Sequence, residues 1–169
     1  VLERRLGGRA SPVRLEVHTE LESTNRHLLE RPPPAGTAAA CVAEFQTNGR
    51  GRRGRSWRTP LGAGLCLSLG WQFERIPPEL AALPLAVGVV VRRVLAAAAA
   101  IEARLKWPND LVWEERKLGG ILLEMSAEAH GGCHVVIGVG LNVDVPRTLL
   151  ARICDWPRGA VDLATARGG

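Results

Sequence analysis

An arginine-rich loop is the segment of this 169-residue sequence best suited to bind an anion. Its basic residues are Arg50, Arg52, Arg53, Arg55 and Arg58, with interleaved glycines and no acidic residue among them. Guanidinium groups are planar donors that make paired hydrogen bonds to phosphate or carboxylate, and Trp57 adds a flat surface on which a base could stack. The pattern favours a site for a small polyanion such as a nucleoside triphosphate. The alternative is a solvated basic loop.

The glycines of this loop formally match the G-x-G-x-x-G fingerprint of dinucleotide-binding proteins. Gly49, Gly51 and Gly54 have the required spacing and follow a predicted strand. A dinucleotide site needs a helix directly after the glycines, but Pro60 and Gly62 stand there instead. No Gly-Lys-Ser/Thr sequence follows, so the loop is not a P-loop either.

A second cluster is Lys106-Trp107-Pro108-Asn109-Asp110. Proline, asparagine and aspartate are typical of a tight turn, and a turn alone would explain these three residues. A nucleotide site would instead use a cation for phosphate, an amide for the base or ribose, and a carboxylate near phosphate-bound Mg²⁺. Both readings stay open for this segment.

Two predicted strands carry glycines where a ligand could approach the backbone. Gly119 and Gly120 follow Lys117 in one of them, where a β-bulge is the alternative explanation. Gly138, Gly140 and Asn142 alternate in the other strand and therefore share one face, which is left largely without side chains. Tight packing of that face against a helix is the alternative.

The hydrophobic pattern predicts an α+β fold with a mixed, mostly antiparallel sheet and helices packed on one face. We expect strands at 13–17, 38–46, 64–73, 104–107, 111–113, 117–127 and 133–143, and helices at about 24–30 and 78–100. Pro84 should distort the longer helix or begin its main part. From Asp144 onward the pattern weakens, and 146–169 is expected to be loop or an incomplete C-terminal element. Residues 1–169 are expected to form a single domain.

Composition limits the other classes of protein. The formal net charge is +5, and the four cysteines form no C-x-x-C pair, which predicts neither a disulfide framework nor a zinc knuckle. The longest apolar run contains Arg92 and Arg93, each of which would cost about 2.5 to 3.5 kcal/mol at a bilayer centre. The first eight residues show no apolar signal segment. A cytoplasmic protein without a membrane span is therefore expected.

Taken together, five segments make the sequence resemble the catalytic domain of bacterial biotin protein ligases. They are, in order, STN at 23–25 with Gln46, GRGRRGRSW, KWPND, KLGGILLE and GVGLNV, and the resemblance runs from about 13 to 145. It implies an enzyme that activates biotin with ATP to biotinyl-5′-AMP and transfers biotin to a lysine of a carrier protein, releasing AMP. Mg²⁺ is the implied cofactor, and the biotin carboxyl carrier of acetyl-CoA carboxylase or a related carboxylase is the implied partner.

The resemblance also implies roles for individual residues. Biotin would lie among Ser23, Thr24, Gln46, Gly49, Arg50, Arg52, Lys117, Gly120 and Gly138. ATP would contact Arg52, Arg55, Trp57, Lys106, Asn109, Asp110, Lys117 and Asn142. Lys117, Arg52 and Arg50 are the expected catalytic residues, because cations offset the repulsion between carboxylate and phosphate. Asp110 is the candidate Mg²⁺ ligand.

The sequence also differs from the family pattern in its domains, and two alternative functions have to be considered. Many relatives carry an N-terminal helix-turn-helix domain and a small C-terminal β-barrel, and neither is expected within 1–169, so binding of nucleic acid is not expected. A homodimer through an exposed sheet edge is possible. The rivals are a ligase or transferase for lipoate or octanoate, and a noncatalytic nucleic-acid-binding module whose binding would fall steeply with salt.

Overall fold

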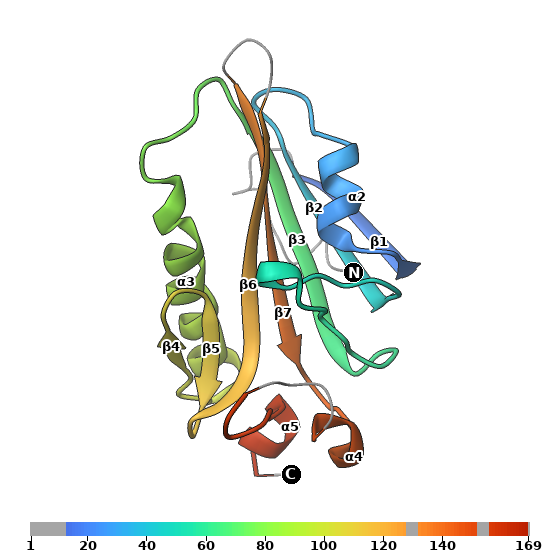
Figure 1. The fold of residues 1–169 in the computed structure, drawn as a ribbon, viewed down its shortest axis with the longest axis vertical. Helices are drawn as coiled ribbons and strands as arrows, with labels where there is room; N and C mark the ends of the chain where they lie inside the picture. Colours follow the sequence, from blue (N-terminus) through green and yellow to red (C-terminus); the bar gives the residue numbers. More distant parts are fainter. Residues whose placement is uncertain (1–12, 128–131, 152–155, 169) are drawn as a thin grey trace.

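A seven-stranded sheet is the centre of the computed structural model, which describes residues 13–127, 132–151 and 156–168 (Figure 1). Its spatial order is β1-β2-β3-β7-β6-β5-β4, with β1 and β2 parallel and all other neighbours antiparallel. The strands are β1 (Val13–Leu21), β2 (Ala38–Gln46), β3 (Gly64–Phe73), β4 (Arg104–Lys106), β5 (Asp110–Trp113), β6 (Arg116–Ala127) and β7 (Cys133–Asn142). The predicted mixed, mostly antiparallel sheet is confirmed.

The two main helices lie on opposite faces of this sheet, so the expectation that they share one face is wrong. Leu28 of α2 (Thr24–Glu30) packs with Val136 of β7, whereas α3 (Leu83–Ala99) packs on a cluster that contains Ile137 and Val139. Val136 and Ile137 are successive residues of one strand, and successive side chains point to opposite faces. The hydrophobic pattern of each helix shows that it has a buried side, but not which face of the sheet covers it.

Helix α3 follows a single 3₁₀ turn, η2 (Leu80–Ala82), and has Pro84 in its first turn, as expected. The stretch Leu80–Ala99 is the one described helical segment that is long and apolar enough to cross a membrane, with a mean hydropathy of 1.9. Gly88 and Leu95 are buried on its inner side, while Arg92 and Arg93 are exposed on its outer side. One side of α3 packs on the sheet and completes its core. The apolar composition of this segment is therefore explained by its position as a core helix of a folded domain.

The C-terminal segment is more ordered than its sequence pattern suggests. It contains two single-turn helices, α4 (Arg147–Leu150) and α5 (Leu163–Ala166), which lie at one end of the sheet (Figure 1). Ala160 forms a parallel bridge with Lys117 of β6, and the Asn142 side chain donates to the Val161 carbonyl at 3.0 Å. The described part of this segment is thus loop with two helical turns, and long-range contacts dock it on the sheet.

The described cysteines are unpaired, in agreement with the sequence. Cys41, Cys66 and Cys133 are free and buried, and Cys154 lies outside the described residues. Burial raises the pKa of the Cys66 thiol to about 11, with hydrogen bonds to Gln46 and Trp57 acting in the opposite direction. Cys66 therefore stays a neutral thiol at physiological pH and is unsuited to act as a nucleophile.

Candidate functional site

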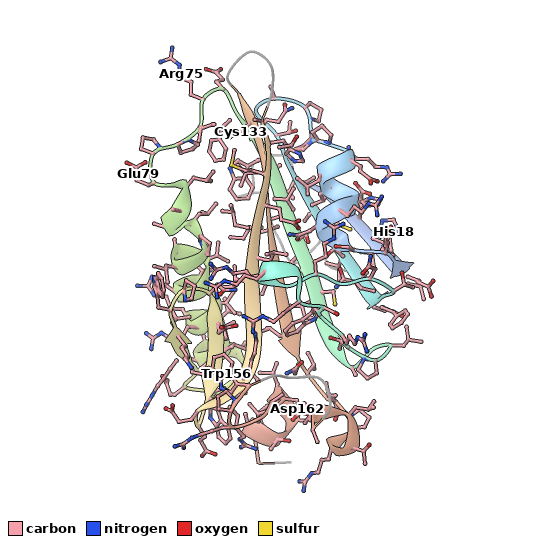
Figure 2. All side chains as sticks on the ribbon, in the orientation of Figure 1. His18, Arg75, Glu79, Cys133, Trp156 and Asp162 are labelled. Carbon is pink, nitrogen blue, oxygen red and sulfur yellow. The ribbon has the colours of Figure 1, made fainter. Side chains whose placement is uncertain are left out.

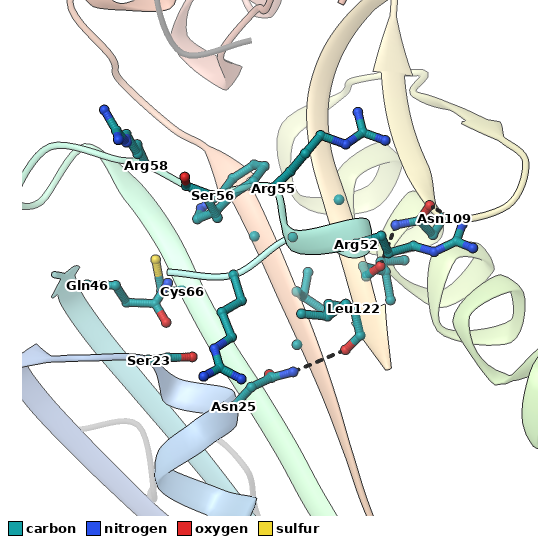
Figure 3. Close-up of a pocket in the computed structure, with 18 of the residues that line it drawn as sticks. Ser23, Asn25, Gln46, Arg52, Arg55, Ser56, Arg58, Cys66, Asn109 and Leu122 are labelled. Atoms are coloured by element: carbon teal, nitrogen blue, oxygen red, sulfur yellow. Dashed lines mark hydrogen bonds between the residues drawn. The ribbon is translucent and has the colours of Figure 1, made fainter. Parts of the chain in front are cut away.

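A cavity of about 380 Å³ lies between the start of α2, the arginine loop and the strands β6 and β7 (Figure 3). It brings together residues that are distant in the sequence but were predicted to share a site. These are Ser23, Thr24, Gln46, Arg50, Arg52, Arg55, Trp57, Asn109, Asp110, Lys117, Gly120, Gly138 and Asn142. Of the predicted set, Gly49 and Lys106 are not in its lining. The arrangement places a buried polar group and a row of cations around one concavity.

One end of the cavity is a hydrogen-bonded network that we call the floor, formed by Ser23, Thr24, Asn25, Gln46 and Ser68. Gln46 Oε1 accepts from the Thr24 backbone N–H at 2.8 Å and from its hydroxyl at 3.2 Å. The Ser68 hydroxyl lies 2.8 Å from the Thr24 hydroxyl and 2.5 Å from Asn25 Oδ1. Ser23 caps α2, and its hydroxyl accepts from the Arg26 N–H. All but Gln46 are buried, so the floor is fixed before any ligand arrives.

The glycines of β6 and β7 are explained by what lies against them. A Cβ at Gly138 would run into the Asn25 amide, and one at Gly140 would lie 2.6 Å from the Trp57 ring. Both are closer than real Cβ contacts allow, so only glycine lets Asn25 and Trp57 approach the sheet. On the opposite face, a Cβ at Gly119 would lie 2.6 Å from a Leu141 methyl group. The alternative given for Gly119, a β-bulge, agrees with the register shift between β5 and β6, where Leu111 pairs with Gly119 but Val112 pairs with Lys117.

The other end of the cavity carries an ion pair. Lys117 Nζ lies 2.6 Å from Asp110 Oδ1, and both side chains are largely buried. The Trp156 ring covers this pair, with Lys117 Nζ 5.6 Å and Lys106 Nζ 3.9 Å from its centre. Lys106 thus contacts the Trp156 ring and does not line the cavity. Among the described lining residues Asp110 holds the only carboxylate, and it is already paired, so the chain alone does not build a Mg²⁺ site.

The arginine loop, residues 49–58, covers the cavity and is held by few contacts. Arg52 donates to Asn109 Oδ1 at 3.1 Å, and Arg50 Nη1 lies 3.5 Å from Glu124 Oε1. Within the loop, the Trp57 N–H donates to the Gly49 carbonyl at 2.8 Å, and a Cβ at Gly49 would collide with the Trp57 carbonyl. Gly49 therefore shapes the loop rather than lining the cavity.

The cations of this loop point in different directions. Arg52 reaches towards Asn109, while Arg55 and Arg58 extend away from Ser23 and Gln46 (Figure 3). Four of the five loop arginines, at 50, 52, 55 and 58, nevertheless line the cavity and are exposed. Their charges are therefore available to an anion that enters from solvent.

Sequence reasoning missed several residues of the site. Asn25 and Glu124 belong to motifs that were singled out, yet no role was assigned to them, although Glu124 Oε2 accepts from Asn25 Nδ2 at 2.9 Å. Trp156 lines the cavity from the C-terminal segment, which lies at one end of the sheet together with Asp162 (Figure 2). Its Nε1 donates to the Glu115 carbonyl at 2.9 Å. No local signal marks Trp156, because only tertiary contacts bring it to the cavity.

The chain is similar in sequence to known proteins. Residues 18–142 match the Biotin/lipoate A/B protein ligase family, and the chain belongs to that family. It is 43% identical over 127 residues to the bifunctional ligase/repressor BirA of Escherichia coli, covering 75% of this chain and 40% of that protein. It is 38% identical over 135 residues to biotin--[acetyl-CoA-carboxylase] ligase of Mycobacterium tuberculosis, covering 76% of this chain and 49% of that protein. The chain thus spans less than half the length of these two relatives.

A solved structure shows the same fold. The biotin protein ligase of Aquifex aeolicus in complex with biotin and ATP superposes with a TM-score of 0.72 at 33% sequence identity. The superposition covers 92% of this chain and 62% of that one. The mixed sheet described above is thus similar to the sheet of that biotin protein ligase.

Proposed function

We propose that the chain activates biotin with ATP to form biotinyl-5′-AMP and then transfers biotin to a lysine of a carrier protein, releasing AMP. One observation carries the proposal: the cations Lys117, Arg50 and Arg52 line the same cavity as the buried polar floor. A mostly apolar bicycle with a polar ureido group suits a small slot that contains a few fixed donors and acceptors. Thr24 and Gln46 would hold the ureido group at that end.

The first step brings two anions together, because the biotin carboxylate attacks the α-phosphorus of ATP and pyrophosphate leaves. Lys117 would stabilise the charge that develops at phosphorus, and the loop arginines would bind the phosphates. When ATP enters, Lys117 can leave its ion pair with Asp110 and bind phosphate oxygens instead. Trp57 and Asn142 would contact the nucleotide.

Magnesium would be held mainly by the phosphates of ATP. Mg²⁺ in such sites usually has one or two carboxylate ligands plus substrate phosphates, and Asp110 is the one carboxylate of the described lining. When bound, it supplies charge neutralisation on the departing pyrophosphate. Asn109 remains the proposed contact to the base or ribose.

In the second step the ε-amine of a carrier lysine attacks the acyl carbon, and AMP leaves with the bonding electrons. Biotinyl-5′-AMP is a mixed anhydride that water destroys, so the arginine loop would protect it by covering the cavity. The proposed partner is the biotin carboxyl carrier of acetyl-CoA carboxylase or a related carboxylase. We expect the reaction to take place in the cytoplasm, and dimerisation through a sheet edge remains a prediction.

The proposal is tested by the mass of a carrier domain after incubation with the chain, ATP, Mg²⁺ and either biotin or lipoate. The expected result is one added biotinyl group on one lysine, no addition of lipoate, and no addition when Lys117→Ala replaces the wild type. Arg92→Ala, on the exposed side of α3, is the matched control and should retain full labelling. Addition of lipoate in place of biotin would contradict the proposal.

A further inference from the structure

Four side chains beneath α2, outside the cavity, have the chemistry of a metal site. We infer that Glu16, His18, His27 and Cys41 bind a zinc ion. Donor atoms of His18, His27 and Cys41 all lie within 4.8 Å of one another. Glu16 Oε2 lies 2.7 Å from His27 Nε2 and 3.5 Å from His18 Nε2. The cluster joins three elements, and none of its members lines the cavity of the proposed ligase site.

The topology of the sheet edge brings these donors together. Glu16 and His18 are two residues apart on β1 and therefore point to the same face. In the parallel pair of β1 and β2, Glu16 is the register partner of Cys41, whose face is covered by α2. Helix α2 then places His27 above that face. Spacing along the sequence hides the cluster, because its members come from separate elements. Figure 2 shows His18 at this edge, far from Cys133.

The set of donors suits zinc better than a hard cation. Zinc prefers imidazole nitrogen and thiolate sulfur, and accepts a carboxylate, in a tetrahedral arrangement. At Zn–N and Zn–S lengths of about 2.0 to 2.3 Å, neighbouring donors of a tetrahedron are about 3.3 to 3.8 Å apart. Donors within 4.8 Å must therefore close in by about 1 Å. His18 lies on the edge strand and His27 on a short helix, so both rings have room to adjust.

A simple ion-pair network would explain only part of the cluster. Glu16 pairs with Arg14 at 3.0 Å as well as with His27, and Arg31 donates to His27 Nδ1 at 3.2 Å. His18 Nε2, however, is buried, makes no geometrically good hydrogen bond among the described residues, and meets Glu16 Oε2 only at the longer ion-pair distance of 3.5 Å. Burial of an unsatisfied ring nitrogen is unfavourable unless a ligand uses it. Zinc would use that nitrogen, and the exposed Arg31 would swing away when the His27 proton moves to Nδ1.

The bound ion would act as a structural clamp. It would join the edge strand β1 to β2 and to α2, and the start of α2 carries Ser23, Thr24 and Asn25 of the floor. Zinc takes no part in the proposed ligase reaction, since the cluster lies outside the cavity. Binding should instead raise the thermal midpoint of unfolding, because only the folded state brings donors from β1, β2 and α2 together.

The test is a titration of the full chain with Co²⁺, a spectroscopic substitute for zinc, followed by displacement with Zn²⁺. We expect one equivalent to give the visible bands of tetrahedral cobalt and a thiolate-to-cobalt charge-transfer band, all abolished by zinc. Cys41→Ala should remove the charge-transfer band, and His18→Gln should weaken cobalt binding at least tenfold. Cys133→Ala removes another buried cysteine far from the cluster and should leave the spectrum unchanged.

Two results would overturn the inference. One is a wild-type spectrum without tetrahedral or thiolate bands, and the other is a spectrum that persists in both Cys41→Ala and His18→Gln. If Cys41→Ala fails to fold by circular dichroism, His18→Gln decides alone, because His18 is partly exposed on an edge strand.

Discussion

The floor and the arginine loop line the same cavity but are built in opposite ways. The floor consists of short, uncharged side chains that are mostly buried and connected by hydrogen bonds of 2.5 to 3.2 Å. The arginines of the loop are long, charged and exposed, and two of them contact other segments of the site, Arg52 with Asn109 and Arg50 with Glu124. A ligand meets a fixed surface on one side and an adjustable cover on the other.

This difference separates recognition from charge stabilisation. Buried hydrogen-bonding groups reject ligands that leave them unpaired, so the floor should decide which acid binds. Exposed guanidinium groups lose little interaction energy when their side chains change conformation. They can therefore stay close to the negative charge as it shifts from the carboxylate to the phosphate. Changes in the floor should therefore alter stability and choice of acid together, whereas changes in the loop should alter the reaction and leave stability intact.

The largest effect is expected from Lys117→Ala, at the charged end of the cavity. Loss of a donor that acts on the developing charge typically costs about 3 kcal/mol, so adenylate formation should fall by about two orders of magnitude. Single-turnover formation of biotinyl-5′-AMP measures it. The double variant Lys117→Ala with Asp110→Asn separates the causes. Recovery of activity in the double variant would show that an unpaired Asp110, and not the lost cation, was responsible.

Gly138→Ala should have the next largest effect, because its Cβ collides with Asn25 and displaces the floor. Overpacking of this kind typically costs about 1 to 3 kcal/mol of unfolding free energy, and biotin affinity should fall with it. Urea denaturation and calorimetric titration with biotin provide the two measurements. Gly120→Ala is the matched control, since its Cβ would have no neighbour closer than 3.6 Å. Equal stability of the two variants would mean that the floor is not rigid.

Arg52→Gly should affect the reaction without affecting stability. Removal of an exposed loop cation should release biotinyl-5′-AMP about tenfold faster, which corresponds to about 1.4 kcal/mol, and should increase labelling of stray amines. Release can be followed by filtration of the preformed adenylate complex, and the urea midpoint should match that of the wild type. An unchanged rate of biotinyl-5′-AMP release would mean that Arg52 has no part in covering the adenylate.

The smallest effect concerns Asp162, which docks the C-terminal segment by accepting a hydrogen bond from the Val145 N–H. Burial alone would raise its pKa, but hydrogen bonds from Thr165 and from the Val145 N–H at 2.8 Å hold it below the ordinary value of 3.8. The charged form therefore stabilises the fold at neutral pH, and this contribution is lost as the pH falls through the lowered pKa. Asp162→Asn should cost about 1 kcal/mol at pH 7. In urea titrations the difference should begin to shrink near pH 3.8 and disappear once the pH is below the lowered pKa of Asp162. A difference that persists in acid would contradict this assignment.

The sequence predicts the strands at this site better than it predicts what surrounds them. β2 and β3 have the predicted bounds, since each is a short run of small or apolar residues between turn residues. β1 continues four residues beyond the predicted end, because its pairing with β2 outweighs its polar composition. The face chosen by α3 and the approach of Trp156 depend on contacts between distant segments, which no local pattern encodes. The Asn25 to Glu124 contact was missed for the same reason.

Pyrophosphate exchange into ATP tests the central claim most directly, since it reports acid activation without any carrier protein. The full chain should catalyse exchange with biotin and not with lipoate, because the floor selects the acid. Exchange should be lost in Lys117→Ala and retained in Arg92→Ala. Exchange that proceeds equally with lipoate, or without any added acid, would contradict the account.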